Sequence, residues 1–274
     1  MCDQMAPRFN TTFGVEIEFT TARHDTEISA ALAAEGLRGW NLKGDGSIHT
    51  RHPRHGLELV SPILSGTDGI EQIKKACRVL ANMGAATNES TGLHIHLGAQ
   101  NLTMKQLRNF ISFYTRFEGA IDQMMAPSRR SGRNQYCGTL STLDRYSYTD
   151  DFYRYPRRAE DIAQRMKLVA AAQTHRDLVD LLPSRYYKVN THALQKHGTI
   201  EVRHHQGTVN ADKIIGWVKM LDLMLGLATM FQSPRPPKEI TPEGDIRLFK
   251  DWMKHSEWGE IAFYDARVAS LVAR

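Results

Sequence analysis

The sequence predicts an α+β fold, in which short strands and longer helices share one core. Short runs that alternate apolar and polar residues lie between longer segments with helical apolar spacing. The regular strand and helix repeat of a parallel barrel is missing. At 274 residues, of which 41% are hydrophobic and 24% charged, the chain has an ordinary globular composition. We expect one large domain over residues 1–232, and a proline-rich connection with a helical tail packed on the same domain over residues 233–274.

Five strands are predicted from their alternation. In the first, Val15, Ile17 and Phe19 share one face, and Glu16 and Glu18 share the other, because successive side chains of a strand point to opposite faces. On a helix, the two glutamates would diverge. The predicted strands cover residues 12–20, 57–61, 92–97, 186–193 and 198–204.

Six helices are predicted from cap residues and apolar spacing. Gly36 and Gly84 follow the first two, and Pro127 stops the third. The longest apolar segment contains Lys219 and Asp222, so it predicts a buried helix rather than a membrane span. The predicted helices cover residues 25–35, 67–83, 103–125, 156–182, 210–231 and 245 to the C-terminus, with a break near Ser256.

The polar positions of four predicted strands hold residue types that bind cations. Each strand taken alone is explained more simply by a solvated face, but such faces usually mix Thr, Lys, Ser and Gln. Because carboxylates and imidazoles recur across all four strands, we predict a metal site. If these strands join one sheet with their aliphatic side chains toward a helical layer, the other face displays Glu16, Glu18, Glu58, His94, His96, Glu201 and Arg203.

The ligand types favour a hard cation. Carboxylates predominate, so Mg²⁺ or Mn²⁺ is expected rather than zinc, and one of the two histidines can join the shell. Arg203 does not bind metal, but its fixed planar charge suits a phosphoryl oxygen. The sequence contains no G-x-x-x-x-G-K-[ST] loop, so a nucleotide would have to be held by the sheet.

A long segment rich in Arg, Ser, Tyr and Asp connects two of the predicted helices. A loop of this length is often a lid or a binding loop, so residues 128–155 are a candidate lid. Its Arg129, Arg130 and Arg133 would contact phosphates or an acidic substrate if the loop closed, although such loops are more often solvated.

The chain resembles the amidoligases of the glutamine synthetase and glutamate-cysteine ligase superfamily. The matching segments stand in family order from Phe13 to about Trp217, and this ordered set is more specific than the E-x-E pair alone. The segments are GVEIEF at residues 14–19, DGS at 45–47, ELVSP at 58–62, GLHIH at 92–96, YYKVN at 186–190 and GTIEVRHHQGT at 198–208.

The resemblance implies a curved antiparallel sheet with helices on one face and a concave polar face that binds ATP and divalent ions. Such enzymes phosphorylate a carboxylate and let an amine displace the phosphate. By resemblance, the metal ligands are Glu16, Glu18, Glu58, Glu201 and one of His94 or His96. Arg203 would stabilise the transferring phosphoryl group, and Glu18 and Asp45 complete the catalytic set. Contacts to phosphate or substrate are expected from Ser47, Arg185, Lys188 and Asn190.

Smaller signals leave alternatives open. On local grounds alone, Asp45-Gly46-Ser47 is equally well a tight turn. His204 and His205, at the end of a predicted strand, are more simply buried or solvated than metal ligands. The three cysteines lack C-x-x-C spacing, so neither a disulfide framework nor a thiolate zinc cluster is expected.

Two other functions fit parts of the sequence. An H-x-H pair on a strand also occurs in zinc amidohydrolases, although there it would be expected early in the chain, on a barrel. The net charge of +5 would suit a non-catalytic nucleic-acid-binding protein, but clustered cations with interleaved aromatics occur only near residues 128–158. We expect carboxylate and amine substrates, either small molecules or peptides, and no nucleic-acid or membrane partner. The first ten residues contain no apolar run, so we expect a cytoplasmic protein without a signal peptide.

Overall fold

The computed structural model describes residues 11–130, 134–141, 158–253 and 266. Its centre is an open six-stranded sheet with the order β2-β3-β1-β4-β6-β5, in which all pairings between these strands are antiparallel. The predicted α+β class is confirmed, and the sheet of the described residues is not the parallel barrel of the hydrolase alternative. The strands are β1 (Phe13–Thr21), β2 (Asn41–Gly44), β3 (His55–Val60), β4 (Gly92–Gly98), β5 (Val189–Asn190) and β6 (Thr199–Gln206).

Local sequence signals mark the ends of some of the helices. They are α1 (Asp25–Ala34), α2 (Gly66–Asn82), α3 (Met104–Met124), the 3₁₀ turn η1 (Pro127–Arg129), α4 (Ala159–Ala171), α5 (His175–Leu181), α6 (His192–His197), α7 (Ala211–Met230) and α8 (Pro242–Met253). Thr103 caps α3 in a capping box with Gln106. Gly198 ends α6 with a φ of 65°, a left-handed conformation that glycine adopts without strain.

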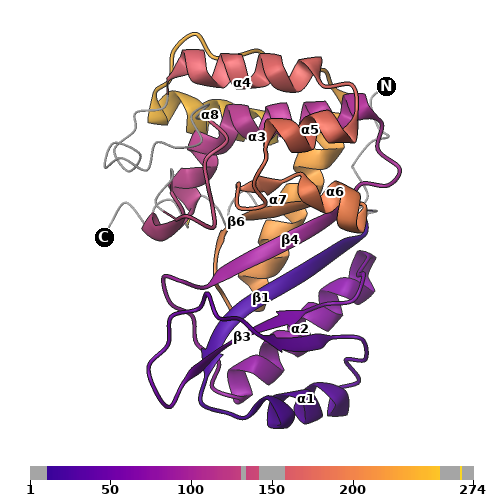
Figure 1. The fold of residues 1–274 in the computed structure, drawn as a ribbon, viewed down its shortest axis with the longest axis vertical. Helices are drawn as coiled ribbons and strands as arrows, with labels where there is room; N and C mark the ends of the chain where they lie inside the picture. The colour runs from indigo at the N-terminus through magenta and orange to yellow at the C-terminus, as the bar shows by residue number, and fades with distance from the viewer. Residues whose placement is uncertain (1–10, 131–133, 142–157, 254–265, 267–274) are drawn as a thin grey trace.

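The aliphatic side chains of the strands form the core beneath the sheet, as predicted. Val15, Ile17 and Phe19 are at most 1% exposed, and Ile95 and Val202 are fully buried. Figure 1 shows α2 and α7 crossing behind the strands on this side. Helices α2 and α7 therefore cover one face, and the carboxylates and imidazoles of the same strands lie on the other.

A β-bulge interrupts the pairing of β4 with β6. Ile95 pairs with Val202 but Leu93 pairs with His205, so two residues of β6, Arg203 and His204, stand opposite the single residue His94. The side chain of His205 consequently lies on the helical side, where its ring centroid is 5.5 Å from that of Trp217 in α7. A strict alternation after Arg203 would have placed it on the polar face.

Three parts of the secondary-structure prediction were wrong. The predicted strand over residues 186–193 is only the two-residue β5 followed by α6. The predicted helix over residues 156–182 is two helices in the described part of the chain, because Thr174 forms a capping box with Asp177 and starts α5 anew. Edge strand β2 was missed, since it is four residues long and mostly exposed, which leaves no apolar alternation to detect.

The C-terminal helix α8 packs on α3. Arg116 Nη1 lies 2.8 Å from Asp245 Oδ1 in a buried ion pair, and the rings of Phe113 and Trp252 meet edge to face with centroids 5.5 Å apart. The predicted domain limit at residues 232 and 233 stays a prediction. The predicted helix break near Ser256 and most of the candidate lid, residues 131–133 and 142–157, lie outside the described residues. No helix of the described residues is long and apolar enough to span a membrane.

Candidate functional site

Strand register brings the predicted polar residues together on one face. Glu16 of β1 pairs with His94 of β4, and Glu18 pairs with Glu58 of β3. On the other side of β4, His96 pairs with Glu201 of β6. Directly opposed residues of antiparallel strands have neighbouring Cβ atoms, so these pairings place the side chains in contact range.

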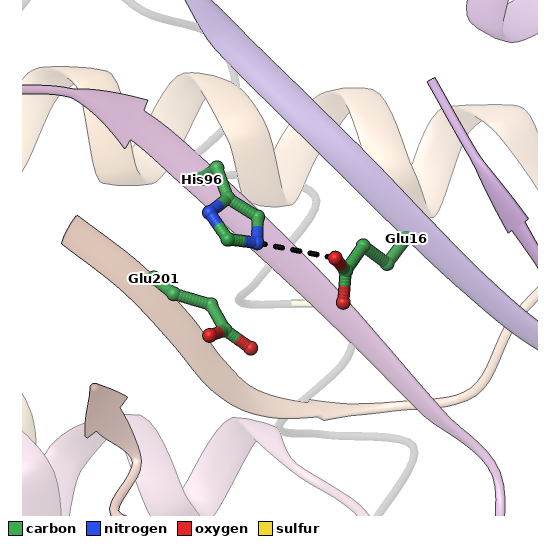
Figure 2. Close-up of side chains that lie close together, drawn as sticks. All are labelled: Glu16, His96 and Glu201. Atoms are coloured by element: carbon green, nitrogen blue, oxygen red, sulfur yellow. Dashed lines mark ion pairs between the residues drawn. The ribbon is translucent and has the colours of Figure 1, made fainter. Parts of the chain in front are cut away.

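Two histidines connect the carboxylates. His94 Nδ1 lies 3.0 Å from Glu16 Oε2, and its Nε2 lies 3.3 Å from Glu18 Oε1. His96 Nε2 lies 3.3 Å from Glu16 Oε1. Figure 2 shows Glu16, His96 and Glu201 pointing toward one another from three neighbouring strands. The side-chain arrangement predicted from alternation is therefore present in the structure.

Three overlapping groups of side chains offer donor atoms to a cation. Within each group, the possible ligand atoms all lie within 4.8 Å of one another. The donors are carboxylate oxygens and imidazole nitrogens, which fit Mg²⁺ or Mn²⁺ with a mixed shell. The groups are Glu16 with His96 and Glu201, Glu16 with Glu58 and His94, and Glu18 with Asp45 and Glu58.

Asp45 reaches the cluster from the turn after β2. Its Oδ1 accepts hydrogen bonds from the backbone nitrogen of Ser47 at 2.8 Å and from Ser47 Oγ at 2.7 Å. The segment is therefore both a local turn and part of the cluster, so the two interpretations of Asp45-Gly46-Ser47 are compatible.

The cluster also contains cations. Lys43 of β2 lies opposite Glu58, and its Nζ is 2.7 Å from Glu58 Oε2. Arg203 Nη1 pairs with Glu201 Oε1, and Arg203 Nε donates to the carbonyl oxygen of Tyr136 at 3.3 Å. These contacts offset part of the repulsion between the carboxylates.

The close packing changes the proton affinities of the carboxylates in opposite directions. Burial works to raise the pKa of Glu16, but hydrogen bonds with His94 and His96 outweigh it and hold that pKa below its usual value. Burial, with the charge of Glu16, raises the pKa of Glu58 to about 7, although Lys43 opposes the shift. Burial works to lower the pKa of His96, but the hydrogen bond with Glu16 and the charge of Glu201 raise it overall.

These residues line a cavity of about 510 Å³ on the polar face of the sheet. Every residue predicted for the site except Lys188 lines it. Asn190 donates from Nδ2 to Glu201 Oε2, and the Arg185 guanidinium lies 4.9 Å from the centroid of the Tyr186 ring. The roles predicted for these residues stay predictions, but their shared location is observed.

The structure places Lys188 outside the cavity, which differs from the prediction that it contacts phosphate or substrate. Its side chain is fully buried away from the cavity, where Nζ lies 2.6 Å from Glu118 Oε1 and 2.7 Å from Asp122 Oδ1 of α3. Strand β5 begins only at Val189, so alternation along a longer strand does not govern the direction of Lys188. His204 is also buried, with Nε2 2.6 Å from Asp122 Oδ1.

Replacing Lys188 by methionine is expected to lower the free energy of unfolding by about 3–5 kcal/mol, because it leaves two buried carboxylates without their cation. Urea denaturation measures this change. Lys74→Met is the matched control, since its pair with Glu71 is solvent-exposed and is worth about 0–1 kcal/mol. Equal stabilities of the Lys188 variant and the parent would contradict the assigned ion pairs.

Several residues of the cavity were not singled out from the sequence. Lys43 lies on the short strand that the alternation rule missed. Tyr136 and Tyr186 meet edge to face with centroids 5.2 Å apart, between the loop before the undescribed residues 142–157 and the segment before β5. Tyr186 stands in the YYKVN segment of the family resemblance, but no role was predicted for it, and nothing in the segment around Tyr136 separates a cavity position from a solvated one.

The fold and the cavity define an α+β protein that carries its titratable groups on one face of an open antiparallel sheet. A sequence model of the family described as "Putative amidoligase enzyme" matches residues 10–225. The match covers most of the chain, so the protein belongs to the amidoligase family, and membership supports an enzyme of the ligase class. No curated protein matches the chain.

Proposed function

We propose that this protein is an ATP-dependent carboxylate-amine ligase that forms an amide or isopeptide bond through an acyl-phosphate intermediate. The observation that carries the proposal is the convergence of carboxylates and imidazoles around Glu16 in a cavity that also contains Arg203. Carboxylate and imidazole donors suit the Mg²⁺ or Mn²⁺ that accompanies ATP, and a guanidinium suits phosphoryl oxygens. Membership of the amidoligase family supports the ligase class.

The chemistry requires charge neutralisation that these residues can supply. A carboxylate is a poor acyl donor until one of its oxygens becomes a phosphate leaving group. Bound Mg²⁺ would neutralise phosphate charge and orient the nucleotide. The residues that would hold it are Glu16, Glu18, Glu58, Glu201 and one of His94 or His96. Arg203 is proposed to stabilise the transferring phosphoryl group through its guanidinium, which also pairs with Glu201.

A second cavity gives room for a second reactant. It measures about 630 Å³ and shares Glu16, Val60, His96 and His197 with the first cavity. Its lining includes apolar side chains such as Ile63, which is 84% exposed. A ligase that joins two substrates beside one nucleotide needs adjoining spaces of this kind.

The remaining roles follow the family resemblance. Asp45 and Ser47 are proposed as residues on the substrate or amine side, and Arg185 and Asn190 as contacts for phosphate or substrate carboxylate. We further propose that the sheet corresponds to the curved catalytic sheet of glutamine synthetase. A cytoplasmic location and the absence of nucleic-acid partners stay predictions.

The test is ADP formation by the purified protein with ATP, Mg²⁺ and a panel of paired carboxylates and amines. We expect ADP only when both reactants and the metal are present, and omission of each component is the control. No ADP from any pair in protein shown to bind Mn²⁺ would contradict the proposal. Amide hydrolysis that requires zinc and ignores ATP would support the hydrolase alternative instead.

The affinity for Mn²⁺ is expected to rise with pH. A cation must displace the proton from Glu58, whose pKa is raised to about 7. Below that value the affinity should increase about tenfold per pH unit, and above it the affinity should level off. Calorimetric titration in two buffers of different ionisation enthalpy measures the released protons. An affinity that is independent of pH between about 6 and 8 would contradict this coupling.

A further inference from the structure

A buried arginine without a partner for part of its guanidinium lines the candidate site. Arg129 is 2% exposed, yet it is among the residues that line the 510 Å³ cavity. Among the described residues, its Nε and Nη1 have no hydrogen-bond partner. Buried donors are normally paired, because burial removes them from water without replacing the lost hydrogen bonds. A ligand that supplies acceptor oxygens would complete this guanidinium.

The backbone beside Arg129 is open enough for a guanidinium only because residue 92 is glycine. A side-chain carbon on Gly92 would lie 2.8 Å from Arg129 Nη2 and 2.9 Å from His94 Nε2, closer than real contacts allow. The backbone nitrogen of Gly92 donates to Glu18 Oε2 at 2.6 Å. The guanidinium of Arg129 therefore lies at the edge of the carboxylate and histidine cluster, where a phosphoryl or carboxylate group of a reactant would enter.

Three other cations that line the cavity have partners. Arg203 pairs with Glu201, Lys43 pairs with Glu58, and Arg185 Nη2 donates to Tyr186 Oη at 2.8 Å. The nearby thiol of Cys137 supplies no negative charge, because burial raises its pKa although Arg129 works to lower it. Among the described cations of the cavity, Arg129 differs in that its unpartnered nitrogens are buried.

The position of Arg129 is fixed by the sheet. Its backbone nitrogen donates to the carbonyl oxygen of Ala126 at 2.9 Å in η1. The backbone nitrogen of Ala126 donates to Oε1 of Gln206, at the end of β6, at 3.0 Å. These contacts hold the backbone, and the side chain is enclosed at 2% exposure, so binding would cost little further ordering of Arg129.

We propose that Arg129 is an anion-recognition residue, whose guanidinium binds the oxygens of a phosphoryl or carboxylate group in the cavity. This inference deepens the proposed function, and it rests on that function for the source of the anion, either the nucleotide or the acid substrate. The binding itself requires no turnover, so equilibrium measurements separate it from the ligase chemistry.

The test compares the parent with Arg129→Met, Arg129→Lys and Arg130→Met by isothermal titration and thermal shift. Arg130 is the matched control, since it is the neighbouring residue, does not line the cavity and donates from Nε to the carbonyl oxygen of Met125. The probes are ATP with Mg²⁺, inorganic phosphate with Mg²⁺, and glutarate, all at constant ionic strength. Circular dichroism and the melting temperature without probe show whether each variant folds.

Arg129→Met is expected to lower the affinity for at least one probe by about 30-fold or more, while the affinities of Arg130→Met stay within about threefold of those of the parent. Arg129→Lys should give an intermediate loss of affinity, because lysine keeps the charge without the planar donors. If Arg129→Met does not fold, the affinity of Arg129→Lys tests the proposal. Losses confined to ATP and phosphate would assign a phosphoryl group, and a loss confined to glutarate would assign a carboxylate. Three results would overturn the proposal. They are equal losses of affinity in the Arg129 and Arg130 variants, unchanged affinity in both, and no binding of any probe to the parent at about 10 mM.

Discussion

Glu16→Gln is expected to abolish divalent cation binding and, with it, carboxylate-dependent ADP formation. Glu16 belongs to two of the three candidate ligand groups and contacts both His94 and His96. Glutamine keeps the shape but removes the negative charge, so we expect Mn²⁺ affinity to fall by about 100-fold or more and the rate of ADP formation by about 10³-fold. Titration of Mn²⁺ followed by electron paramagnetic resonance measures the first effect directly.

The fold should survive this substitution with some loss of stability, because glutamine keeps the side-chain volume but loses the charge that His94 and His96 stabilise. Glu71→Gln is the matched control, since Glu71 is an exposed helical residue paired with Lys74. Glu71→Gln should leave both the Mn²⁺ affinity and the rate of ADP formation unchanged. If Glu16→Gln binds Mn²⁺ as well as the parent does, Glu16 is not a ligand, and the assignment of the cluster must be abandoned.

Arg203→Ala is expected to lower the rate of ADP formation by about 10³-fold while leaving Mn²⁺ bound. Arg203 has its pKa raised by the charge of Glu201 against the opposing effect of burial, so it carries a full positive charge at all accessible pH values. Removing it frees Glu201 from its ion pair, and Mn²⁺ affinity should stay the same or rise. Glu16→Gln should therefore lower the Mn²⁺ affinity, whereas Arg203→Ala should lower only the rate of ADP formation.

The comparison needs a control arginine and a conservative variant. Arg176→Ala removes an exposed helical ion pair with Asp180 and should change neither rate nor affinity. Arg203→Lys should recover little activity, because an ammonium lacks the planar set of donors that matches phosphoryl oxygens. A rate of ADP formation in Arg203→Ala equal to that of the parent would remove this residue from the mechanism.

Sequence alone predicted the parts of the site that strand alternation determines. Val15, Ile17 and Phe19 face the helices because their burial stabilises the sheet, and this fixes Glu16 and Glu18 on the opposite face. The same logic placed His94 with His96 and Glu201 with Arg203. Alternation gives the face of a strand but not its neighbours, so the convergence of these residues depended on a sheet order that only the structure supplied.

The failures lie where alternation does not operate. Lys188 precedes a two-residue strand, and its burial depends on Glu118 and Asp122, which are distant in sequence. Arg129 and Arg130 are adjacent and chemically identical, and only the space left by Gly92 and the turn of η1 separate the cavity residue from the control. Such positions depend on contacts between distant segments, so no local pattern identifies them.

Because of the bulge in β6, odd-numbered residues point to opposite faces of the sheet at the two ends of this strand. Before the bulge, Glu201 faces the cavity, as the alternation of β6 opposite β4 requires. Beyond the bulge the alternation is shifted by one residue, so the side chain of His205 lies on the helical side of the sheet. A deletion of His204 would remove the bulge and leave Arg203 alone opposite His94, whereas a deletion of Arg203 would put His204 in that position. Which of the two residues is lost would therefore decide whether a guanidinium or an imidazole faces the carboxylates.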